Sequence, residues 1–387
     1  MQKRLAKFAA LCLPLVFAIV FFAPSVSWIR KAIYALLVLP MLPVVLMQIR
    51  QLNWPATLLI AAFTGFTTAS NLWGAAAATD ALYGNINHSI GILLFVASLM
   101  TLARFEDYRL KMSAVILASA TASALYAMLT FYPAHPYSER LFGWHCYDWP
   151  TELGYLYGLG ILAGAWVMAH SLHSAIRLLV VVCIVILLAG ILLAQARGAL
   201  MALFVGLSIL LLHFKWGRAI ALLLVGSCLI FVTLLIFDVV KFRNDTLETR
   251  WQLWQFLIHK QNNVWIGVGE NVAIHKKIMG ELHRHAHSIY ISAYYKTGVI
   301  GLTLLIAMLS SAFYYAYQQY RQHKAALSLL ALSWLTYSTV LCLSDYGSLI
   351  GLPSILWYFI WAPIGLALAQ WPVKNPQPLG STVKEIT

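Results

Sequence analysis

The chain has 387 residues, of which 61% are hydrophobic and only 10% are charged, with 26 Lys and Arg against 13 Asp and Glu. A soluble fold needs far more charge, and several apolar runs here reach roughly 18 residues, which is enough to span a membrane as a helix. The composition therefore excludes a soluble protein and predicts an all-α polytopic membrane protein. The five cysteines predict no disulfide framework, because Cys12, Cys183, Cys228 and Cys342 lie inside apolar runs.

The first apolar segment, residues 8–23, follows a basic N-terminus, as in a signal peptide. The bulky Phe21 and Phe22 followed by Pro24 make a poor cleavage site, so we expect the segment to be retained as a first span. Further spans are expected near residues 32–47, 55–73, 88–103, 113–131, 153–170, 178–194, 198–213, 219–237, 298–316, 326–343 and 349–370, about twelve in all.

Two of these spans come from one almost unbroken apolar stretch, Leu178 to Phe214. At about 1.5 Å per residue, a helix of this length crosses a bilayer twice. We therefore predict a helical hairpin with the short segment Gln195–Gly198 at its tip.

The distribution of Lys and Arg predicts the orientation. Fourteen lie on the side of the N-terminus: Lys3, Arg4, Lys7, Arg50, Arg104, Arg109, Lys111, Arg177, Lys215, Arg218, Arg321, Lys324, Lys374 and Lys384. The short loops on the opposite side hold only four: Arg30, Lys31, Arg140 and Arg197. Positive residues favour the cytoplasmic side, so both termini are predicted to be cytoplasmic.

The long loop between the ninth and tenth spans is predicted to lie outside. It divides the chain into transmembrane helices 1–9 (residues 1–237), a loop subdomain with interfacial helices (238–297), and transmembrane helices 10–12 with a cytoplasmic tail (298–387). It holds the remaining basic residues, Lys241, Arg243, Arg250, Lys260, Lys276, Lys277, Arg284 and Lys296, diluted by five acids. This basicity either has no meaning in a long loop or attracts an anionic group at the outer membrane face.

An amphipathic helix is predicted early in this loop. Asp245 followed three residues later by Glu248 is typical of a capping box. One apolar stripe follows at helical spacing: Leu247, Trp251, Trp254 and Ile258. Such a helix lies in the membrane interface. Arg250, on the flank of the stripe, either snorkels towards lipid phosphates or faces a site.

The end of the loop is rich in histidine. Val264–Gly269 is predicted to form a turn with two glycines, and His283, His285 and His287 then alternate with Arg284 and Ala286. Three readings remain open: a zinc site, a general base among the histidines, or a polar rim above a span. The cationic Arg284 opposes metal binding.

His287-Ser288, nine residues, then Gly298 and Gly301 resembles the periplasmic signature of the O-antigen ligase family, which is His, a small polar residue, nine positions and Gly-x-x-Gly. The segment Gln195–Gly198 looks like the Arg-Gly at the top of an inner helix in that family. Arg250 with Trp254 and the glycine turn is similar to the start of its long periplasmic loop. The overall layout of spans and loop also resembles these ligases.

The resemblance implies a GT-C-like fold and a glycosyltransferase of the bacterial inner membrane. It would move O-antigen polysaccharide from undecaprenyl diphosphate to a sugar hydroxyl of lipid A-core at the periplasmic face, without a cofactor or metal. Arg197 and Arg250 would bind the diphosphate and His287 would be the catalytic base, with Arg284 and His285 as helpers in substrate binding. No acidic cluster for Mg²⁺ is visible in the sequence.

Two other functions remain open. An O-antigen polymerase would be expected to carry two large, arginine-rich outer loops, whereas the earlier loop here, 132–151, holds only Arg140. A transporter or flippase of an anionic lipid would be expected to have ionisable sites at the bilayer midplane and internal repeats. Asp345 and Tyr346 are predicted to lie in an outer turn, where a solvated turn is favoured over contact with substrate.

Overall fold

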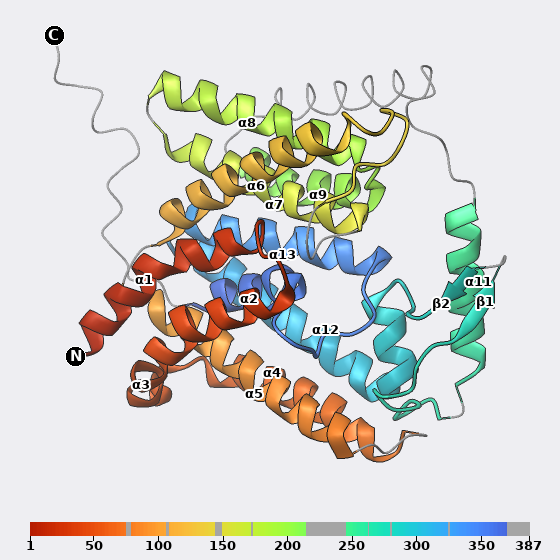
Figure 1. Cartoon of the computed structure of the whole chain (residues 1–387). Helices are drawn as coiled ribbons and strands as arrows, with labels where there is room; N and C mark the ends of the chain where they lie inside the picture. Colours follow the sequence, from red (N-terminus) through yellow and green to blue (C-terminus); the bar gives the residue numbers. More distant parts are fainter. Residues whose placement is uncertain are drawn as a thin grey trace, which may run out of the picture.

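The computed structural model describes residues 1–74, 79–105, 108–143, 149–171, 173–213, 245–261, 263–278, 281–323 and 326–369. Nearly all of this chain is helical, as a membrane requires, because a helix satisfies its own backbone hydrogen bonds in lipid. The helices form one bundle, and α11 lies across one end of it, at the end opposite the N-terminus (Figure 1).

The first half of the bundle comprises α1 (Gln2–Ile19), α2 (Val26–Ala32), a π-helical segment Ile33–Val38, α3 (Leu39–Met47), α4 (Trp54–Ala69), α5 (Thr79–Leu102) and α6 (Arg109–Phe131). Short 3₁₀ turns, Ile49–Gln51 and Ser70–Leu72, lie before and after α4. The second half comprises α7 (Pro150–His170), α8 (Ser174–Leu193), α9 (Arg197–His213), α12 (Ile289–His323), α13 (Ala326–Ser344), a π-helical segment Trp357–Trp361 and α14 (Ala362–Leu368).

By length and composition, six helical stretches of the described residues qualify as membrane spans: Val26–Met47, Asp80–Leu102, Arg109–Phe131, Pro150–His170, Ser174–Leu193 and Ile289–Gln322. The prediction of an all-α membrane protein is thereby confirmed. Each other predicted span coincides with a helix, except 219–237, which lies outside the described residues. The count of twelve stays a prediction.

The core of the bundle is built from large aromatic side chains. Trp166, Trp334 and Trp361 are almost fully buried. Phe17 of α1 packs edge-on against Trp334 of α13, with ring centroids 5.7 Å apart. The Tyr358 hydroxyl donates to the Val16 carbonyl at 2.7 Å, so its polar end is satisfied inside the core. These contacts join the first and last helices of the chain.

The predicted hairpin at Gln195–Gly198 is confirmed. Gln195 takes a left-handed backbone conformation (φ 52°) between α8 and α9, which reverses the chain. On the neighbouring α7, Gly154 has no side chain where a Cβ would overlap Ala196. This close approach seats the hairpin tip against the first turn of α7.

The outer loop contains α11 (Asp245–His259) and an antiparallel pair of short strands, β1 (Lys276–Ile278) and β2 (Glu281–His283), with Lys276 opposite His283. Leu253 and Leu257 form the buried face of α11 together with Ile274 and Ile278. The predicted single stripe is therefore wrong in part, because Trp251 is 59% exposed and Ile258 is 44% exposed. Trp254 instead turns towards the histidine segment, residues 283–287.

Candidate active site

The histidine segment is held between β2 and the start of α12. The Trp254 indole donates to the Ala286 carbonyl at 2.8 Å, which fixes α11 against the middle of the segment. His287 then adopts a left-handed conformation (φ 51°) immediately before α12 begins. This conformation is uncommon outside glycine and is frequent at functional sites. The His287 ring lies 4.0 Å from that of His285 and 5.7 Å from that of His283, centroid to centroid.

The principal partner of His287 is Asp345, which follows α13. The His287 Nδ1 lies 3.8 Å from the Asp345 Oδ1, and the aspartate side chain is only 16% exposed. The Tyr155 hydroxyl of α7 donates to Oδ2 at 2.6 Å, and the Tyr346 backbone amide donates to Oδ1 at 2.8 Å. The expectation that Asp345 lies in a solvated turn is thus wrong, because helix packing places its carboxylate beneath the histidines.

The charge state of Asp345 follows from these contacts. Burial raises the pKa of the Asp345 carboxyl. The contacts with His287, Tyr155 and the Tyr346 amide lower this pKa by more than burial raises it, so the pKa is below the ordinary value. Asp345 is therefore ionised at neutral pH. An ionised carboxylate facing Nδ1 favours the His287 tautomer that keeps its proton there, which leaves Nε2 with a free lone pair.

His285 has a different environment. Its side chain packs so closely on Gly347 that a Cβ at that glycine would overlap the His285 Cβ. Its Nδ1 is buried and has no hydrogen-bond partner among the described residues. Burial, with further repulsion from His287, His283 and Arg250, lowers the pKa of His285 to about 4. This ring is therefore neutral at neutral pH.

We expect this histidine to make the protein less stable in mild acid. Between pH 6.5 and about 4, the unfolded chain binds a proton at His285 that the folded chain does not, so the unfolding free energy falls as the pH falls through this window. The contribution of Asp345 is lost only at lower pH, because its pKa is depressed below 3.8. In detergent, the melting temperature of His285→Gln should vary less between pH 6.5 and 4 than that of wild type. The exposed His259→Gln is the control, and identical slopes for wild type and His285→Gln would contradict the assignment.

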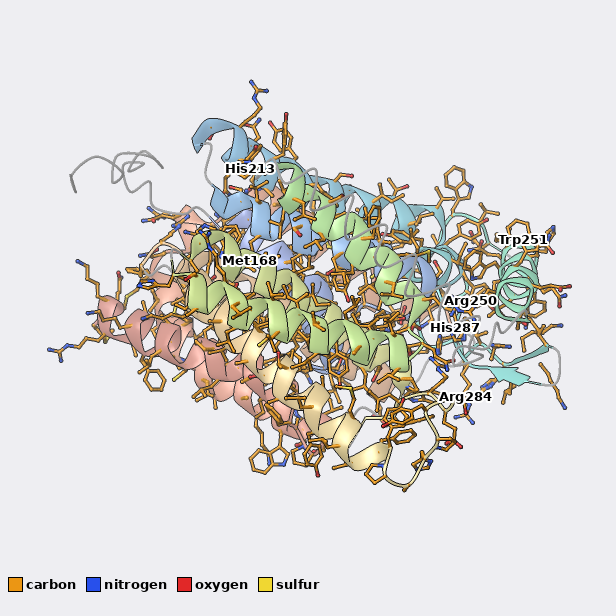
Figure 2. The ribbon with its side chains drawn as sticks, turned by 90° about the horizontal axis from the view of Figure 1, so that it is seen from above. Met168, His213, Arg250, Trp251, Arg284 and His287 are labelled. Atoms are coloured by element: carbon orange, nitrogen blue, oxygen red, sulfur yellow. The ribbon has the colours of Figure 1, made fainter. Side chains whose placement is uncertain are left out.

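The predicted arginines differ in their placement. Arg250 of α11 is partly exposed, and its charge acts on both His285 and Tyr155. Arg250 and His287 lie together at the α11 end of the bundle, and Arg284 lies at this end too (Figure 2). Arg284 is exposed and follows β2. Arg197 is the first residue of α9, next to Ala196, which packs on Gly154 beside Tyr155.

The glycine signature has an architectural role. Gly298 (φ 66°) interrupts α12, and the segment 264–269 bonds to the opened turn. The Val299 amide donates to the Val264 carbonyl at 2.8 Å, and the Gly269 amide donates to the Lys296 carbonyl at 2.8 Å. A Cβ at Gly298 would overlap the Trp265 backbone, and one at Gly267 would overlap Lys296. The glycines therefore let the loop backbone pack directly against α12 at residues 296–300.

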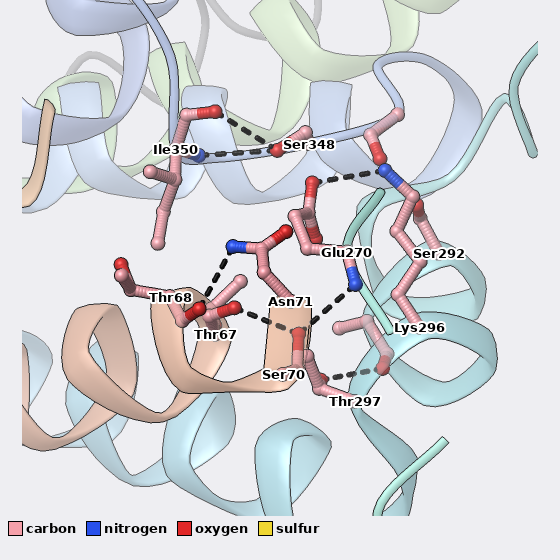
Figure 3. Close-up of polar contacts among 12 residues, drawn as sticks. Thr67, Thr68, Ser70, Asn71, Glu270, Ser292, Lys296, Thr297, Ser348 and Ile350 are labelled. Atoms are coloured by element: carbon pink, nitrogen blue, oxygen red, sulfur yellow. Dashed lines mark hydrogen bonds and ion pairs between the residues drawn. The ribbon is translucent and has the colours of Figure 1, made fainter. Parts of the chain in front are cut away.

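A buried polar cluster lies beside this contact between the loop and α12 (Figure 3). The Lys296 ammonium is 2.9 Å from the Glu270 carboxylate, and both side chains are nearly buried. The Glu270 amide donates to the Ser70 hydroxyl at 2.9 Å, and the Ser292 hydroxyl donates to the Gly347 carbonyl. A cavity of about 20 Å³ next to them has room for one water molecule only. Lys296 therefore forms a structural ion pair with Glu270 and does not contribute to the basic outer surface of the loop.

One group among the described residues has the donors for a metal ion. The ligand atoms of His285, His287 and Asp345 all lie within 4.8 Å of one another. Two histidines and a carboxylate suit Zn²⁺. The Arg250 charge acts on His285 and opposes a cation there.

The structure adds two residues that the sequence reasoning did not assign, Asp345 and Tyr155. Asp345 carried a signal, because it is the only acidic residue between Glu281 and Glu385. A lone carboxylate in so apolar a region is costly unless it is bonded. Tyr155 carried none, being one of 19 tyrosines.

The comparisons with known proteins point to O-antigen ligases. A family model described as O-antigen ligase matches residues 182–306, which include the hairpin tip, α11, the histidine segment and the broken start of α12. An O-antigen ligase of Pseudomonas aeruginosa is 25% identical over 356 residues, which cover 88% of this chain and 85% of that protein. The match therefore extends over nearly the whole bundle as well as the loop. The chain is thus similar to O-antigen ligases over most of its length.

Proposed function

We propose that the protein is an inverting, metal-independent glycosyltransferase of the bacterial inner membrane. It transfers O-antigen polysaccharide from undecaprenyl diphosphate to a sugar hydroxyl of lipid A-core at the periplasmic face, with both termini in the cytoplasm. The observation that carries the proposal is the convergence of His287, Asp345 and Arg250 from three separate elements at one end of the bundle. Because both substrates are lipids, a site at the edge of the bilayer is reachable by each of them.

His287 acts as the general base. With Asp345 facing its Nδ1, Nε2 accepts the proton of the acceptor hydroxyl. The hydroxyl oxygen attacks the anomeric carbon as the bond from that carbon to the diphosphate oxygen breaks, and the electron pair of this bond leaves with the diphosphate. Attack opposite the leaving group inverts the configuration. Asp345 holds the ring in position and stabilises the imidazolium that forms.

The arginines stabilise the leaving group. Negative charge grows on the diphosphate as the glycosidic bond breaks, and planar guanidinium groups offer it paired, charge-assisted hydrogen bonds. The Arg250 charge acts on His285, and Arg197 begins α9 next to Ala196, which packs on Gly154 of α7. Arg284 and His285 assist in binding. His285 adds no further charge, since it is neutral at neutral pH.

This role of arginine removes the need for a divalent cation at the diphosphate. The residues that would hold one are His285, His287 and Asp345, and a metal there would compete with the His287 ring for the Asp345 carboxylate that orients it. We therefore expect bound metal to inhibit the reaction rather than support it.

The proposal is tested in liposomes that contain the purified protein, labelled lipid-linked glycan and lipid A-core. We expect label to pass to the core lipid at an unchanged rate after EDTA treatment, and added Zn²⁺ to slow it. Loss of activity with EDTA that only Zn²⁺ restores would overturn metal independence. Growth of the lipid-linked glycan without core attachment would instead indicate a polymerase, and movement of lipid between leaflets without transfer would indicate a flippase.

A further inference from the structure

A cluster of stacked aromatic rings lies in the loop that follows α6, at the same end of the bundle as α11 (Figure 1). Phe131 stacks on His135 with centroids 4.1 Å apart and planes 7° from parallel, and Phe142 lies 6.0 Å from Phe131. Tyr137 stacks on Tyr132 at 4.7 Å. Tyr137 is nevertheless 67% exposed and Phe142 is 44% exposed. The rings therefore pack on one another and still offer free faces.

This loop is fixed to the hairpin tip that carries Arg197. The Arg140 Nε donates to the Ala194 carbonyl at 3.2 Å, and the Leu141 amide donates to the Leu193 carbonyl at 2.9 Å. From the other side, the side-chain Nε2 of Gln195 donates to the Ser138 carbonyl at 3.4 Å. The rings are thus held in place before any ligand arrives, which lowers the entropic cost of binding.

Polar groups accompany the rings. His135 and Glu139 form an exposed pair at 2.9 Å, and the Tyr132 hydroxyl donates to the Glu139 carbonyl at 3.2 Å. Aromatic side chains also gather at membrane surfaces as anchors. An anchor needs only one ring at headgroup depth, whereas this loop stacks rings face to face and bonds them to the active-site hairpin. Such a surface suits a ligand with flat apolar faces and hydroxyl edges.

We propose that Tyr132, Tyr137 and Phe142 form a platform for the pyranose rings of the donor glycan, beyond the sugar attached to the diphosphate. The C–H groups of a pyranose face carry partial positive charge and pack on the negative face of an aromatic ring. The donor is the occupant because the hairpin tip that holds the loop also carries Arg197, which the proposed function assigns to the donor diphosphate. The platform rests on that function.

The test compares two donors on the same lipid diphosphate, one with a full O-antigen polymer and one with a single sugar. For Tyr137→Ala we expect the KM for the polymer to rise about threefold to tenfold, the scale of one aromatic contact. The KM for the single-sugar donor and the kcat for both should stay at wild-type values. Tyr137→Phe, which keeps the ring, should behave as wild type. Tyr83→Ala is the matched control, because Tyr83 of α5 is also 67% exposed.

A binding experiment separates the platform from the chemistry. Lipid-free oligosaccharide of the same repeat is added to the His287→Ala protein, and contacts are read by saturation-transfer NMR. We expect transfer to the sugar protons, with a clear loss when Tyr137→Ala is added and none when Tyr83→Ala is added. Failure of the base assignment would leave this binding result intact. Equal sugar signals in both double variants, with a wild-type KM for the polymer in Tyr137→Ala, would overturn the platform.

Discussion

Replacing His287 with alanine is expected to lower the rate of glycan transfer by about a hundredfold to ten-thousandfold, the usual contribution of a general base. Among the described groups that contact Asp345, only the imidazole can accept a proton near neutral pH, so none of the others replaces it. The loss should appear in kcat at saturating concentrations of both substrates. The measurement is transfer of labelled lipid-linked glycan to lipid A-core by purified protein in liposomes.

Two further variants serve as comparisons for His287→Ala. His259→Ala removes an exposed histidine of α11 whose Nδ1 pairs with the Gln255 carbonyl of its own helix, and it should keep wild-type activity. Asp345→Asn should cause a smaller loss than His287→Ala, because it weakens the orientation of the ring and leaves the ring itself. Melting temperature and membrane insertion are measured for each. Near-normal transfer by a folded His287→Ala protein would remove His287 from the base role.

Substituting Arg250 with lysine is expected to reduce transfer about a hundredfold to a thousandfold, the scale of losing one preorganised donor at a developing negative charge. Lysine keeps the charge but presents a point donor, and it cannot form the two parallel hydrogen bonds of a planar guanidinium. The deficit should lie mainly in kcat, because the diphosphate gains most of its charge in the transition state. The readout is a full kinetic series with the donor.

The control for Arg250 comes from the same helix. Lys260 directly follows α11, with its ammonium 5.2 Å from the Phe256 ring, so Lys260→Arg changes a cation on this loop without touching the site. It should transfer glycan at the wild-type rate. If Arg250→Lys and Lys260→Arg behave alike, Arg250 is a lipid-facing cation of the interface rather than a ligand of the diphosphate.

Much of the local structure could be predicted from the sequence. The hairpin at Gln195–Gly198, the helix starting at Asp245 and the glycine turn at 264–269 lie where the pattern predicts them. Each depends on residues close in the chain: apolar runs, a polar tip, glycines that tolerate positive φ. The start of α12 was predicted less accurately, because the helix begins at Ile289 rather than near 298. The polar residues of its first turns are buried among α4, the loop and the segment after α13.

The inward turn of Trp254 could not be predicted in the same way. Spacing alone places it on one stripe with Trp251 and Ile258. In the folded protein, Leu253 and Leu257 supply the buried face, and the Trp254 indole reaches the Ala286 carbonyl. A single helix has several plausible apolar faces when tryptophans lie on more than one side. The partner surface, here the β1–β2 pair and the histidine segment, selects among them.

The sequence by itself determined that this chain enters a membrane as a bundle of helices with one long basic loop, because lipid forces each apolar run to satisfy its own backbone hydrogen bonds. It also indicated which histidine and which arginines to test. Only the tertiary structure decided that Asp345 and Tyr155 belong with His287. These residues are separated by tens to hundreds of positions, and their contact depends on how α7, α12 and α13 pack, which no local pattern records.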